Sequence, residues 1–262
     1  MPFIAHRVFD WVPVEIDDSW ELKTIKNGIA YSICNSLQCS NCHHLFLDIR
    51  FNDIEMDRLY KGYRGDAYVN LREKYEPGYS KKNKALNKGY NYIKDIERFI
   101  KPYLSSSLKI LDWGGDTSKN TPFRNSCDLM HIYDISNVEV LRNATMIGKK
   151  EISNTSYDLI ICSNVLEHIP YPKTILNDIK LAMDQRTVLY IELPFENLVR
   201  EAGKKSDLYK IKKHWHEHIN FFNLNSIEQL LKSSNLKILE INTLPISDET
   251  SDYIFQVCCR LN

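Results

Sequence analysis

The sequence lacks an excess of charge of either sign, because its 34 Lys and Arg residues equal its 34 Asp and Glu residues. A chain without net charge creates no long-range field that draws in DNA, RNA or an anionic membrane surface. It also lacks any apolar run approaching the roughly 20 residues of a membrane span. Residues 1–18 do not combine a basic segment with an apolar one, as a secretory signal does. We therefore expect a cytoplasmic protein without a membrane span, whose partners do not include nucleic acid.

Internal repeats and low-complexity tracts are absent as well, so the 262 residues suit one α/β domain with a smaller addition. The seven cysteines are an odd number. Cys127, Cys162, Cys258 and Cys259 lie in or beside apolar, strand-like sequence, which is typical of small buried thiols in a reducing compartment. We expect no disulfide bonds.

Three regions follow one another along the chain: 1–52, 53–103 and 104–262. The first has scattered aromatics, three cysteines and little helical periodicity, which predicts a small N-terminal module that is β-rich or irregular. The second has apolar side chains at helical spacing, a break at Glu76-Pro77-Gly78 and a predicted helix over 82–100. We expect this second region to form a helical lid or linker.

Strands and helices alternate in the third region. Several short apolar runs show no period-two alternation and are separated by helical sequence, which is typical of strands buried on both faces of a parallel sheet. These runs are LKILDWGG at 108–115, MHIYDIS at 130–136, YDLIICSNV at 157–165 and TVLYIELP at 187–194. The alternation predicts an α/β domain with a doubly wound, Rossmann-like sheet.

Two more strand candidates, 236–244 and 252–260, end the chain, and the connector between them is too short for a crossover helix. Strands joined so tightly pair antiparallel. We therefore predict a sheet of about seven strands that ends in an antiparallel hairpin. A plain dinucleotide-binding fold does not end in this way.

The residues after the first predicted strand indicate the ligand, because ligands of open α/β sheets bind beyond the carboxyl ends of the strands. Gly114 and Gly115 allow a tight turn and a close approach to a ligand, yet the G-x-G-x-x-G of a pyrophosphate binder is missing. Carboxylates at Asp112 and Asp116 repel a diphosphate and suit a ligand with sulfonium and ammonium groups. The loop favours S-adenosylmethionine over NAD. Asp134, after the second strand, is placed to accept hydrogen bonds from ribose hydroxyls.

These segments resemble motifs of a known family. ILDWGGD at 110–116, HIYD at 131–134 and YDLIICSNVLEHI at 157–169 resemble the first, second and fourth motifs of class I S-adenosylmethionine-dependent methyltransferases. The resemblance covers about residues 82–262 and implies S-adenosylmethionine as the cofactor. By this match the cofactor-binding residues are Asp112, Gly114, Gly115, Asp134, Ser163 and Asn164. The chain departs from the family pattern D-x-G-x-G-x-G at Asp116 and Ser118, which leaves the conformation of the loop open.

The segment KKHWHEHINFF at 212–222 is expected on the acceptor side of the sheet. Methyl transfer to an oxygen needs a group that takes the hydroxyl proton, and histidine, with a pKa of about 6.5, suits that task. His218 is the predicted base with Glu217 beside it, since this Glu-His pair resembles one in bacterial sugar-tailoring methyltransferases. A surface loop or a metal site is the alternative. His216 and His218 would share one face of a strand and could bind metal there, although no matching acid or cysteine lies adjacent in the sequence to complete such a site.

Three residues are predicted to bind the substrate: Tyr75, Tyr79 and His168. Glu167 and His168 either begin a helix and pack under the sheet, or contact a bound ligand. Tyr75 and Tyr79 flank the Pro-Gly turn of the predicted lid, where aromatic rings suit stacking on a sugar and the neighbouring basic residues suit a phosphate. Packing is the alternative for both tyrosines.

The N-terminal cysteines resemble part of the small zinc-binding module that precedes many of these sugar methyltransferases. That module has two C-x-x-C pairs, whereas this chain has only Cys39-Ser-Asn-Cys42, with Cys34 alone nearby. Zinc bound by Cys34, Cys39, Cys42 and a histidine is one interpretation. A degenerate module with free thiols is the other, so the metal stays open.

The sequence thus predicts methyl transfer from S-adenosylmethionine to a small-molecule acceptor. The resemblance implies a sugar hydroxyl, free or nucleotide-linked, in the biosynthesis of a surface polysaccharide such as a capsule. Within this class, C-methylation of a keto-sugar and methylation of a phosphoramidate-type capsule substituent are alternatives. Outside it, the alternatives are an NAD-dependent sugar-modifying enzyme and a non-catalytic zinc-bearing protein.

Overall fold

The structure, a computed structural model, describes residues 2–4, 14–21, 26–30, 33–48, 50–60, 62–63, 65–75, 78–136, 138–201, 218–247 and 252–262. Its helices are α2 (Asp53–Tyr60), α3 (Asp66–Tyr75), α4 (Tyr79–Leu86), α5 (Ile93–Ile100), α6 (Pro172–Lys180), α7 (Asn197–Arg200) and α8 (Leu224–Ser233). Short 3-10 turns cover Asp18–Trp20, Lys101–Tyr103 and Lys149–Asn154. The longest of these helices have ten residues, about half of what crossing a bilayer takes.

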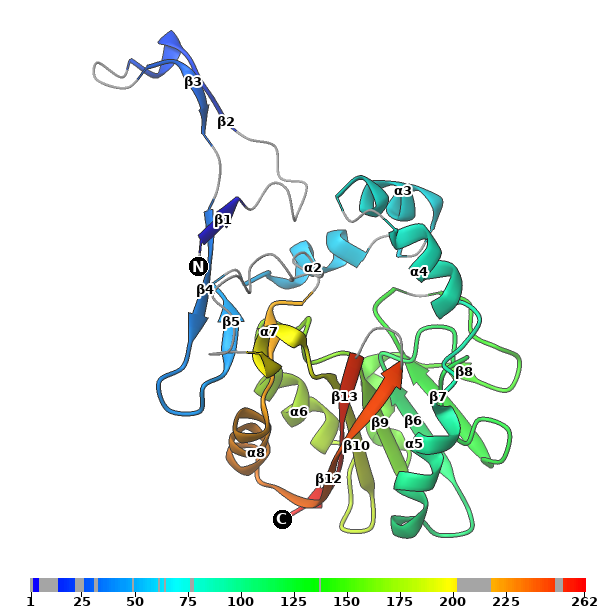
Figure 1. Ribbon diagram of the computed structural model, residues 1–262. Coiled ribbons are helices and arrows are strands. Elements are labelled where there is room, and N and C mark those ends of the chain that lie inside the picture. Colours follow the sequence, from blue (N-terminus) through cyan, green and yellow to red (C-terminus); the bar gives the residue numbers. More distant parts are fainter. Residues whose placement is uncertain are drawn as a thin grey trace.

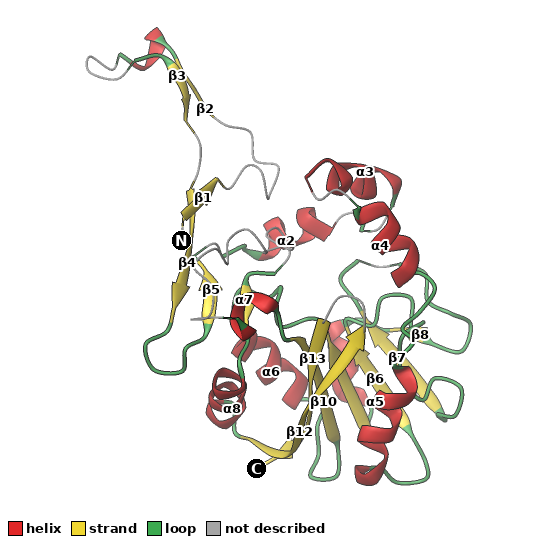
Figure 2. Ribbon diagram, in the orientation of Figure 1, coloured by secondary structure: helices red, strands yellow, loops and turns green. Residues whose placement is uncertain are grey.

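A central sheet of the described residues has the strand order β12-β13-β10-β9-β6-β7-β8. The strands are β6 (Lys109–Trp113), β7 (Leu129–Tyr133), β8 (Thr145–Met146), β9 (Leu159–Ser163), β10 (Val188–Pro194), β12 (Leu236–Ser247) and β13 (Asp252–Leu261). The pairs β10-β9, β9-β6, β6-β7 and β7-β8 are parallel, while β13 is antiparallel to both β10 and β12 (Figure 2). The predicted Rossmann-like sheet with a terminal antiparallel hairpin is confirmed.

The inner strands of this sheet are buried on both faces, as two neighbouring residues of β6 illustrate. Ile110 of β6 faces α5, whose Ile96 and Ile100 are almost fully buried. Leu111, the next residue, belongs to the opposite core with the buried side chains of α6 and α8. This two-sided burial explains why the strands read as continuous apolar runs in the sequence.

The helix predicted over 82–100 is wrong in one respect, since the structure has two helices, α4 and α5, in its place. The chain breaks at 87–92, where Gly89 has a φ of +99°, a conformation that a helix cannot contain. Helix α5 packs into the core, whereas α2, α3 and α4 lie above the edge of the sheet at which the parallel strands end (Figure 1). Of the helices that the structure describes, α2, α3 and α4 have the position expected of a lid.

The N-terminal region contains short strands, as its lack of helical periodicity predicted. A second sheet has the order β1-β4-β5-β11 and consists of β1 (Pro2–Ile4), β4 (Ile33–Gln38), β5 (Leu45–Leu47) and β11 (Asn220–Phe221). Strands β2 (Val14–Ile16) and β3 (Gly28–Ala30) form a separate pair, far from the central sheet in Figure 1. Because β11 belongs to the segment that contains His218, the N-terminal module is joined directly to the region around that histidine.

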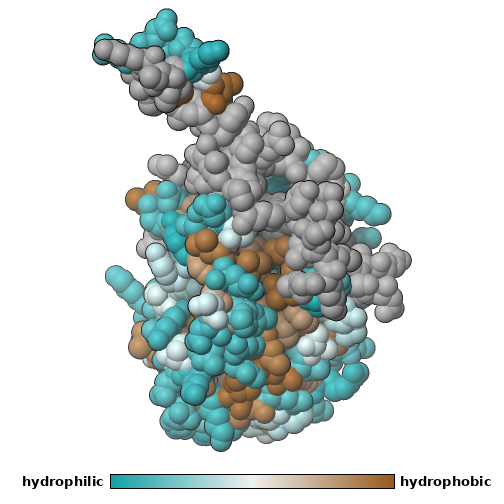
Figure 3. All heavy atoms as spheres, turned by 60° about the vertical axis from the view of Figure 1, so that its left-hand side comes forward, coloured by the Kyte–Doolittle hydropathy of each residue, from teal (hydrophilic) through white to brown (hydrophobic). Residues whose placement is uncertain are grey.

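The surface is mixed in character. In Figure 3, hydrophilic side chains cover much of the visible face, and apolar side chains form a band between them. Single exposed apolar residues such as Leu181 and Leu224 are ordinary on protein surfaces.

Candidate active site

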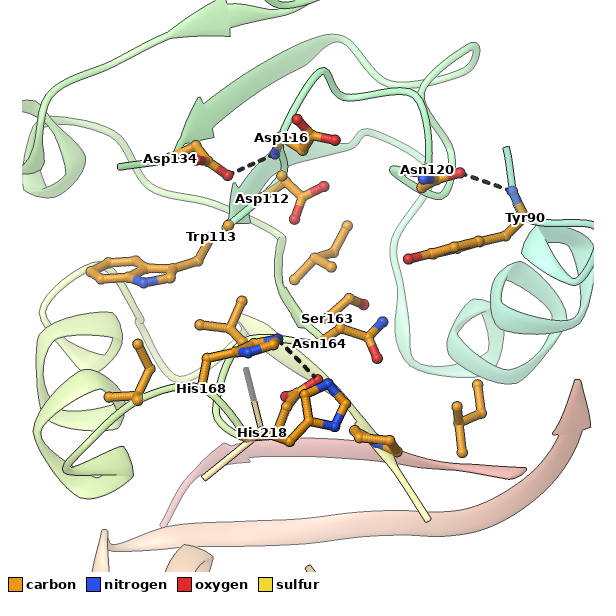
Figure 4. Close-up of a pocket in the computed structure, with 18 of the residues that line it drawn as sticks. Tyr90, Asp112, Trp113, Asp116, Asn120, Asp134, Ser163, Asn164, His168 and His218 are labelled. Atoms are coloured by element: carbon orange, nitrogen blue, oxygen red, sulfur yellow. Dashed lines mark hydrogen bonds and ion pairs between the residues drawn. The ribbon is translucent and has the colours of Figure 1, made fainter. Parts of the chain in front are cut away.

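The carboxyl ends of β6, β7, β9 and β10 open into a cavity of about 480 Å³. Helix α2 contributes Met56 and Tyr60 to its wall, and the segment before β11 contributes His218. Figure 4 shows three acids, Asp112, Asp116 and Asp134, along one wall, with His168 and His218 along the opposite wall. We call these the cofactor half and the acceptor half of the cavity.

Gly114 begins the cofactor half, and its position excludes any larger residue. Its φ is +83°, and a Cβ atom there would lie 2.5 Å from Cγ2 of Val165 in the loop after β9. Its N–H donates a hydrogen bond of 2.7 Å to the carbonyl of Tyr133. The loops after β6 and β9 therefore approach each other as closely as a glycine allows.

Asp116 and Ser118 occupy the two positions at which the chain departs from the glycines of the family pattern. Both have positive φ values, +50° and +66°, so the loop has the left-handed conformation that glycine adopts most readily. The N–H of Asp116 donates to Oδ2 of Asp134 at 2.9 Å. The loop after β6 therefore forms a left-handed turn although Asp116 and Ser118 replace two glycines of the family pattern.

Asp134 stands at the end of β7 with its carboxylate held in place. Besides the bond from Asp116, its Oδ1 accepts hydrogen bonds from the N–H of Ser136 at 2.8 Å and from the Ser136 hydroxyl at 2.5 Å. Its side chain lines the cavity. A carboxylate fixed in this way can accept further hydrogen bonds from a ligand's hydroxyl groups without a large loss of side-chain entropy.

Asp112 is 5% exposed and lines the same half of the cavity. Burial raises the pKa of its carboxyl to about 7, against the effect of a 2.6 Å hydrogen bond from the Thr121 hydroxyl. The nearby carboxylates of Asp134 and Glu192 raise this pKa further. A cationic ligand beside Asp112 would favour its ionised form.

Ser163 ends β9, Asn164 follows it, and both line the cavity between its two halves. Asn164 has a φ of +53°, and its side-chain amide donates to Oε1 of Glu192 at 2.8 Å. Glu192 is fully buried, which raises the pKa of its carboxyl, and it also accepts hydrogen bonds from the hydroxyls of Tyr92 and Tyr190. Asn164 is thus anchored to the core.

The acceptor half is built around His218. Its Nδ1 lies 2.5 Å from Oε1 of Glu196, and its ring centroid lies 4.8 Å from that of His168. His168 Nε2 lies 3.7 Å from the carboxylate of Glu167, and the ring of Tyr60 meets His168 edge-on. Two imidazoles and two carboxylates therefore gather at the part of the cavity facing the lid.

Backbone hydrogen bonds join the two segments that carry these side chains. The carbonyl of Glu167 accepts the N–H groups of Ile219 at 2.9 Å and of Asn220 at 3.0 Å. The side-chain amide of Asn220 donates to the carbonyls of Leu166 and Ile169. His168 and His218 are therefore brought together by main-chain contacts and by the burial of Asn220.

Other predicted site residues lie elsewhere. Glu217, like His214 and His216, is outside the described residues. Tyr75 ends α3, but its side chain is not described. Tyr79 is buried, its ring lies 4.1 Å below the guanidinium of Arg72, and it is not among the described residues that line the cavity. The structure therefore gives Tyr79 a packing environment, and the side chains of α2 face the cavity in its place.

Sequence analysis did not single out several residues of the site. Trp113 and Tyr133 end the first two strands, and their rings lie 4.6 Å apart beside the cavity. Glu192 lies in β10, and Glu196 follows that strand and lines the cavity. A charged residue within an apolar run was the one sequence feature that marked Glu192. Tyr90 precedes α5 and has its N–H held by Asn120.

The Cys39-x-x-Cys42 segment forms a tight turn, with the N–H of His43 donating to the carbonyl of Cys39 at 3.0 Å. Backbone N–H groups of Cys42 and Asn41 lower the pKa of the Cys39 thiol. Neither thiol is part of a disulfide, and both are partly exposed. Cys34 has its backbone in β4, while its side chain is not described. Zinc in this module stays a prediction.

Comparison with known proteins bears on this site directly. The family model described as "Methyltransferase domain" matches residues 85–241, which is more than half of the chain. The chain belongs to this methyltransferase family. It is an S-adenosylmethionine-dependent methyltransferase, and the alternatives of an NAD-dependent enzyme and of a non-catalytic protein are dropped.

Solved structures of methyltransferases are similar to this chain, and the first described here shares its fold. A methyltransferase from Burkholderia thailandensis, crystallised with 1,6-didemethyltoxoflavin and S-adenosylhomocysteine, has a TM-score of 0.56 and 12% identity. The match covers 84% of this chain and 95% of that one. A methyltransferase from Anabaena variabilis has a TM-score of 0.48 and 11% identity over 66% of this chain and 84% of its own. The magnesium protoporphyrin IX methyltransferase of Synechocystis, with S-adenosylhomocysteine bound, has a TM-score of 0.45 and 11% identity over 82% of this chain and 90% of its own.

Proposed function

We propose that this enzyme methylates a hydroxyl group of a small sugar-like acceptor, free or nucleotide-linked, in the biosynthesis of a surface polysaccharide. One observation carries the proposal: a single cavity joins the glycine loop of the cofactor half to the histidine cluster of the acceptor half. The sugar class is supported by the resemblance of the segment around His218, and of the N-terminal module, to sugar-tailoring methyltransferases.

The cofactor half fits S-adenosylmethionine. The loop has room for no side chain at Gly114, so the backbone itself lines the site. Asp134 would hold the ribose hydroxyls, and the buried Asp112 would lie towards the cationic methionyl part. S-adenosylmethionine supplies an electrophilic methyl group on a sulfonium. The chain's own residues hold and orient that cofactor, with Ser163 and Asn164 closing the loop between the two halves.

The acceptor half is where the hydroxyl would be placed and would lose its proton. An alcohol is a weak nucleophile until its proton leaves, and the cluster around His218 gathers the polar groups that serve this purpose. Glu196 fixes the orientation of the His218 ring. Glu217 remains a predicted partner. Holding the oxygen in line with the methyl group supplies much of the rate, because it removes the entropy cost of a bimolecular encounter.

Charge in the cavity favours a neutral acceptor group over an anionic one. Six carboxylates line the cavity: Asp112, Asp116, Asp134, Glu167, Glu196 and Asp252. Among the residues that the structure describes, no Lys or Arg joins them. Like charges repel strongly in a partly buried site, so the phosphates of a nucleotide-linked acceptor would remain outside it. A sugar hydroxyl is therefore favoured over a phosphoramidate-type group.

Calorimetric titration with S-adenosylhomocysteine tests the cofactor half. We expect micromolar binding by the wild type and a loss of about 10- to 100-fold in Asp134→Ala, which removes a charged hydrogen-bond acceptor. Asp128→Ala is the matched control, because Asp128 also accepts a backbone N–H, that of Leu108, but lies before β7 at the opposite edge of the sheet. Equal losses in both variants, or no binding by the wild type, would contradict the assignment.

The acceptor class is tested by incubating the enzyme with labelled S-adenosylmethionine and a panel of free and nucleotide-linked sugars. We expect a product that gains one methyl group as an ether, identified by mass and by NMR. A methyl group attached to carbon would assign C-methylation of a keto-sugar instead. Binding of S-adenosylhomocysteine together with failure to methylate any sugar would refute the sugar proposal and leave the enzyme class standing.

A further inference from the structure

The acceptor half contains a group of side chains that matches a metal site. We propose that Glu167, His168 and His218 bind a divalent first-row transition metal of the Zn²⁺ kind. One donor atom from each of the three residues lies within 4.8 Å of the other two. All three residues line the cavity. In the part of the chain that the structure describes, no second group of three such residues comes this close together.

The donor set determines the class of metal. Two imidazole nitrogens and one carboxylate oxygen are a ligand set for zinc, iron and related divalent metals, whereas magnesium and calcium prefer oxygen ligands throughout. Three protein ligands would leave at least one coordination position for another molecule, and all three ligands line the cavity. Sites of that kind are catalytic more often than structural.

Glu196 holds one of the proposed ligands, His218, by its ring. Its carboxylate lies 2.5 Å from Nδ1 of His218, so the other ring nitrogen, Nε2, is the one directed to a metal. A metal-bound histidine commonly donates its second N–H to a carboxylate, which fixes the ring and makes the ligand more basic. The His218–Glu196 pair has this arrangement.

The backbone holds the ligands in place. The carbonyl of Glu167 accepts two hydrogen bonds from the residues that follow His218, so the segments carrying all three ligands are joined next to the donor atoms. Two ligands of one tetrahedral zinc lie roughly 3.4 Å apart, given bonds of about 2.1 Å. Metal binding therefore requires the three donor atoms to move closer together than the present spacing of up to 4.8 Å.

Charge also favours a cation here. The Glu167 side chain is almost entirely buried, and the Glu196 side chain is 13% exposed. Two carboxylates in a partly buried pocket are costly unless positive charge compensates them. A dication bound between Glu167 and the two histidines supplies that charge.

In catalysis, which rests on the proposed function, the metal would bind the acceptor hydroxyl and lower its pKa. The proton passes to water, the oxygen forms its bond to the methyl carbon, and the electrons of the broken carbon–sulfur bond stay on sulfur. His218 then serves as a ligand, which replaces the base predicted from the sequence. Metal binding itself does not depend on this step.

Metal binding is measured on the full chain after removal of metals with a chelator, by titration with Zn²⁺ and with Co²⁺. Because Cys39 and Cys42 can also bind zinc, the titration uses a chain with both changed to serine. We expect one metal per chain, and visible absorption of bound Co²⁺ that shows nitrogen and oxygen ligands. The double variant His168→Ala/His218→Ala should lose at least about 100-fold in affinity, Glu167→Gln about as much, and Glu196→Gln about 10- to 100-fold.

Two controls keep the result decisive. His131→Asn removes a histidine that contacts Tyr157 rather than the cluster, and it should bind the metal as before. Every variant is titrated with S-adenosylhomocysteine, and retained binding shows that it is folded. If the cysteine changes unfold the chain, the wild type is compared with His168→Ala/His218→Ala in the cysteine-containing chain. The variant should then bind one metal ion fewer per chain.

A chain that binds S-adenosylhomocysteine but no metal overturns this inference and leaves the proposed function intact. Metal binding that the His168→Ala/His218→Ala variant retains also overturns it. Failure to bind S-adenosylhomocysteine, with metal binding retained, refutes the cofactor assignment instead.

Discussion

The two halves of the cavity differ in how the chain builds them. In the cofactor half, Asp112, Gly114 and Asp134 stand at the ends of consecutive strands, so short contiguous motifs place them. In the acceptor half, Glu167, Glu196 and His218 come from separate segments that meet through backbone contacts. The cofactor half is therefore local in the sequence, and the acceptor half exists only after folding. Substitutions should separate the two halves functionally.

The largest separation is expected from His218→Ala. Loss of this side chain should lower kcat by about 10²- to 10⁴-fold, the range of a group that handles a proton in the transition state, whether directly or through a metal. The affinity for S-adenosylhomocysteine should change less than about twofold, because His218 lies in the acceptor half. Steady-state kinetics and calorimetry on the same preparation provide the check. Parallel losses in turnover and cofactor affinity would mean that the halves are not separable.

Gly114→Ala should damage the cofactor half first. The added Cβ meets Val165 at 2.5 Å, and the residue must keep a φ of +83°. Overpacking and left-handed strain together should lower the free energy of unfolding by about 2–4 kcal/mol and weaken cofactor binding at least about tenfold. Denaturant unfolding and calorimetry measure the two effects.

Gly78→Ala is the matched control for this change. Its φ is +95°, but nothing lies within 4 Å of the added Cβ, so only the backbone strain remains, at about 1 kcal/mol. The double variant Gly114→Ala/Val165→Ala should recover part of the loss. If Gly78→Ala costs as much as Gly114→Ala, the contact with Val165 is not the cause.

Ionisation of Asp112 should make cofactor affinity depend on pH. Burial raises its pKa to about 7, so the ligand-free protein holds this proton near neutrality, and a cationic ligand must release it. Affinity for S-adenosylmethionine, which carries the sulfonium, should rise up to about tenfold per pH unit below 7 and level off above it. Calorimetry from pH 5.5 to 8.5 should show this slope in the wild type. Asp112→Asn, which keeps Asp134 and Glu192 unchanged, should show an affinity that does not depend on pH.

The same shift has a consequence for stability. Because the folded-state pKa of Asp112 lies above its unfolded value, the folded protein binds more protons between these two pKa values. Its contribution to stability is therefore present at low pH and is lost as the pH rises through about 7. Asp112→Asn should remove this part of the pH dependence of unfolding, and an unchanged profile would place the titration elsewhere.

These contrasts show what the sequence could predict. Strands such as β6 and β9 were predictable because burial on both faces leaves a continuous apolar run, and the hairpin β12-β13 because its connector is short. The prediction of one helix over 82–100 was wrong around Gly89, where a positive φ separates α4 from α5 although the apolar spacing continues. Tyr79 lay at a suitable place in the lid, yet its ring packs on Arg72, which no spacing rule indicates.

The acceptor half was the harder part for a similar reason. The sequence shows a histidine-rich segment in which Glu217 is the adjacent acid, whereas the acids that the structure places near His218 are Glu167 and Glu196, from other loops. Their approach depends on the hydrogen bonds of Asn220 and on the pairing of β11 with the N-terminal module. Such long-range contacts leave no periodic pattern in a single sequence.

The smallest effect is expected from Asp116→Gly, which restores the family's glycine in the loop after β6. The hydrogen bond that reaches Asp134 comes from the backbone N–H of Asp116, and glycine keeps that donor while relieving the left-handed strain. Cofactor affinity should therefore change less than about threefold, and Ser118→Gly should behave alike. A larger loss in Asp116→Gly alone would show that its carboxylate binds the cofactor. Asp116 would then stand in place of the glycine because its carboxylate contacts the cofactor, and not merely because the loop tolerates a left-handed non-glycine residue.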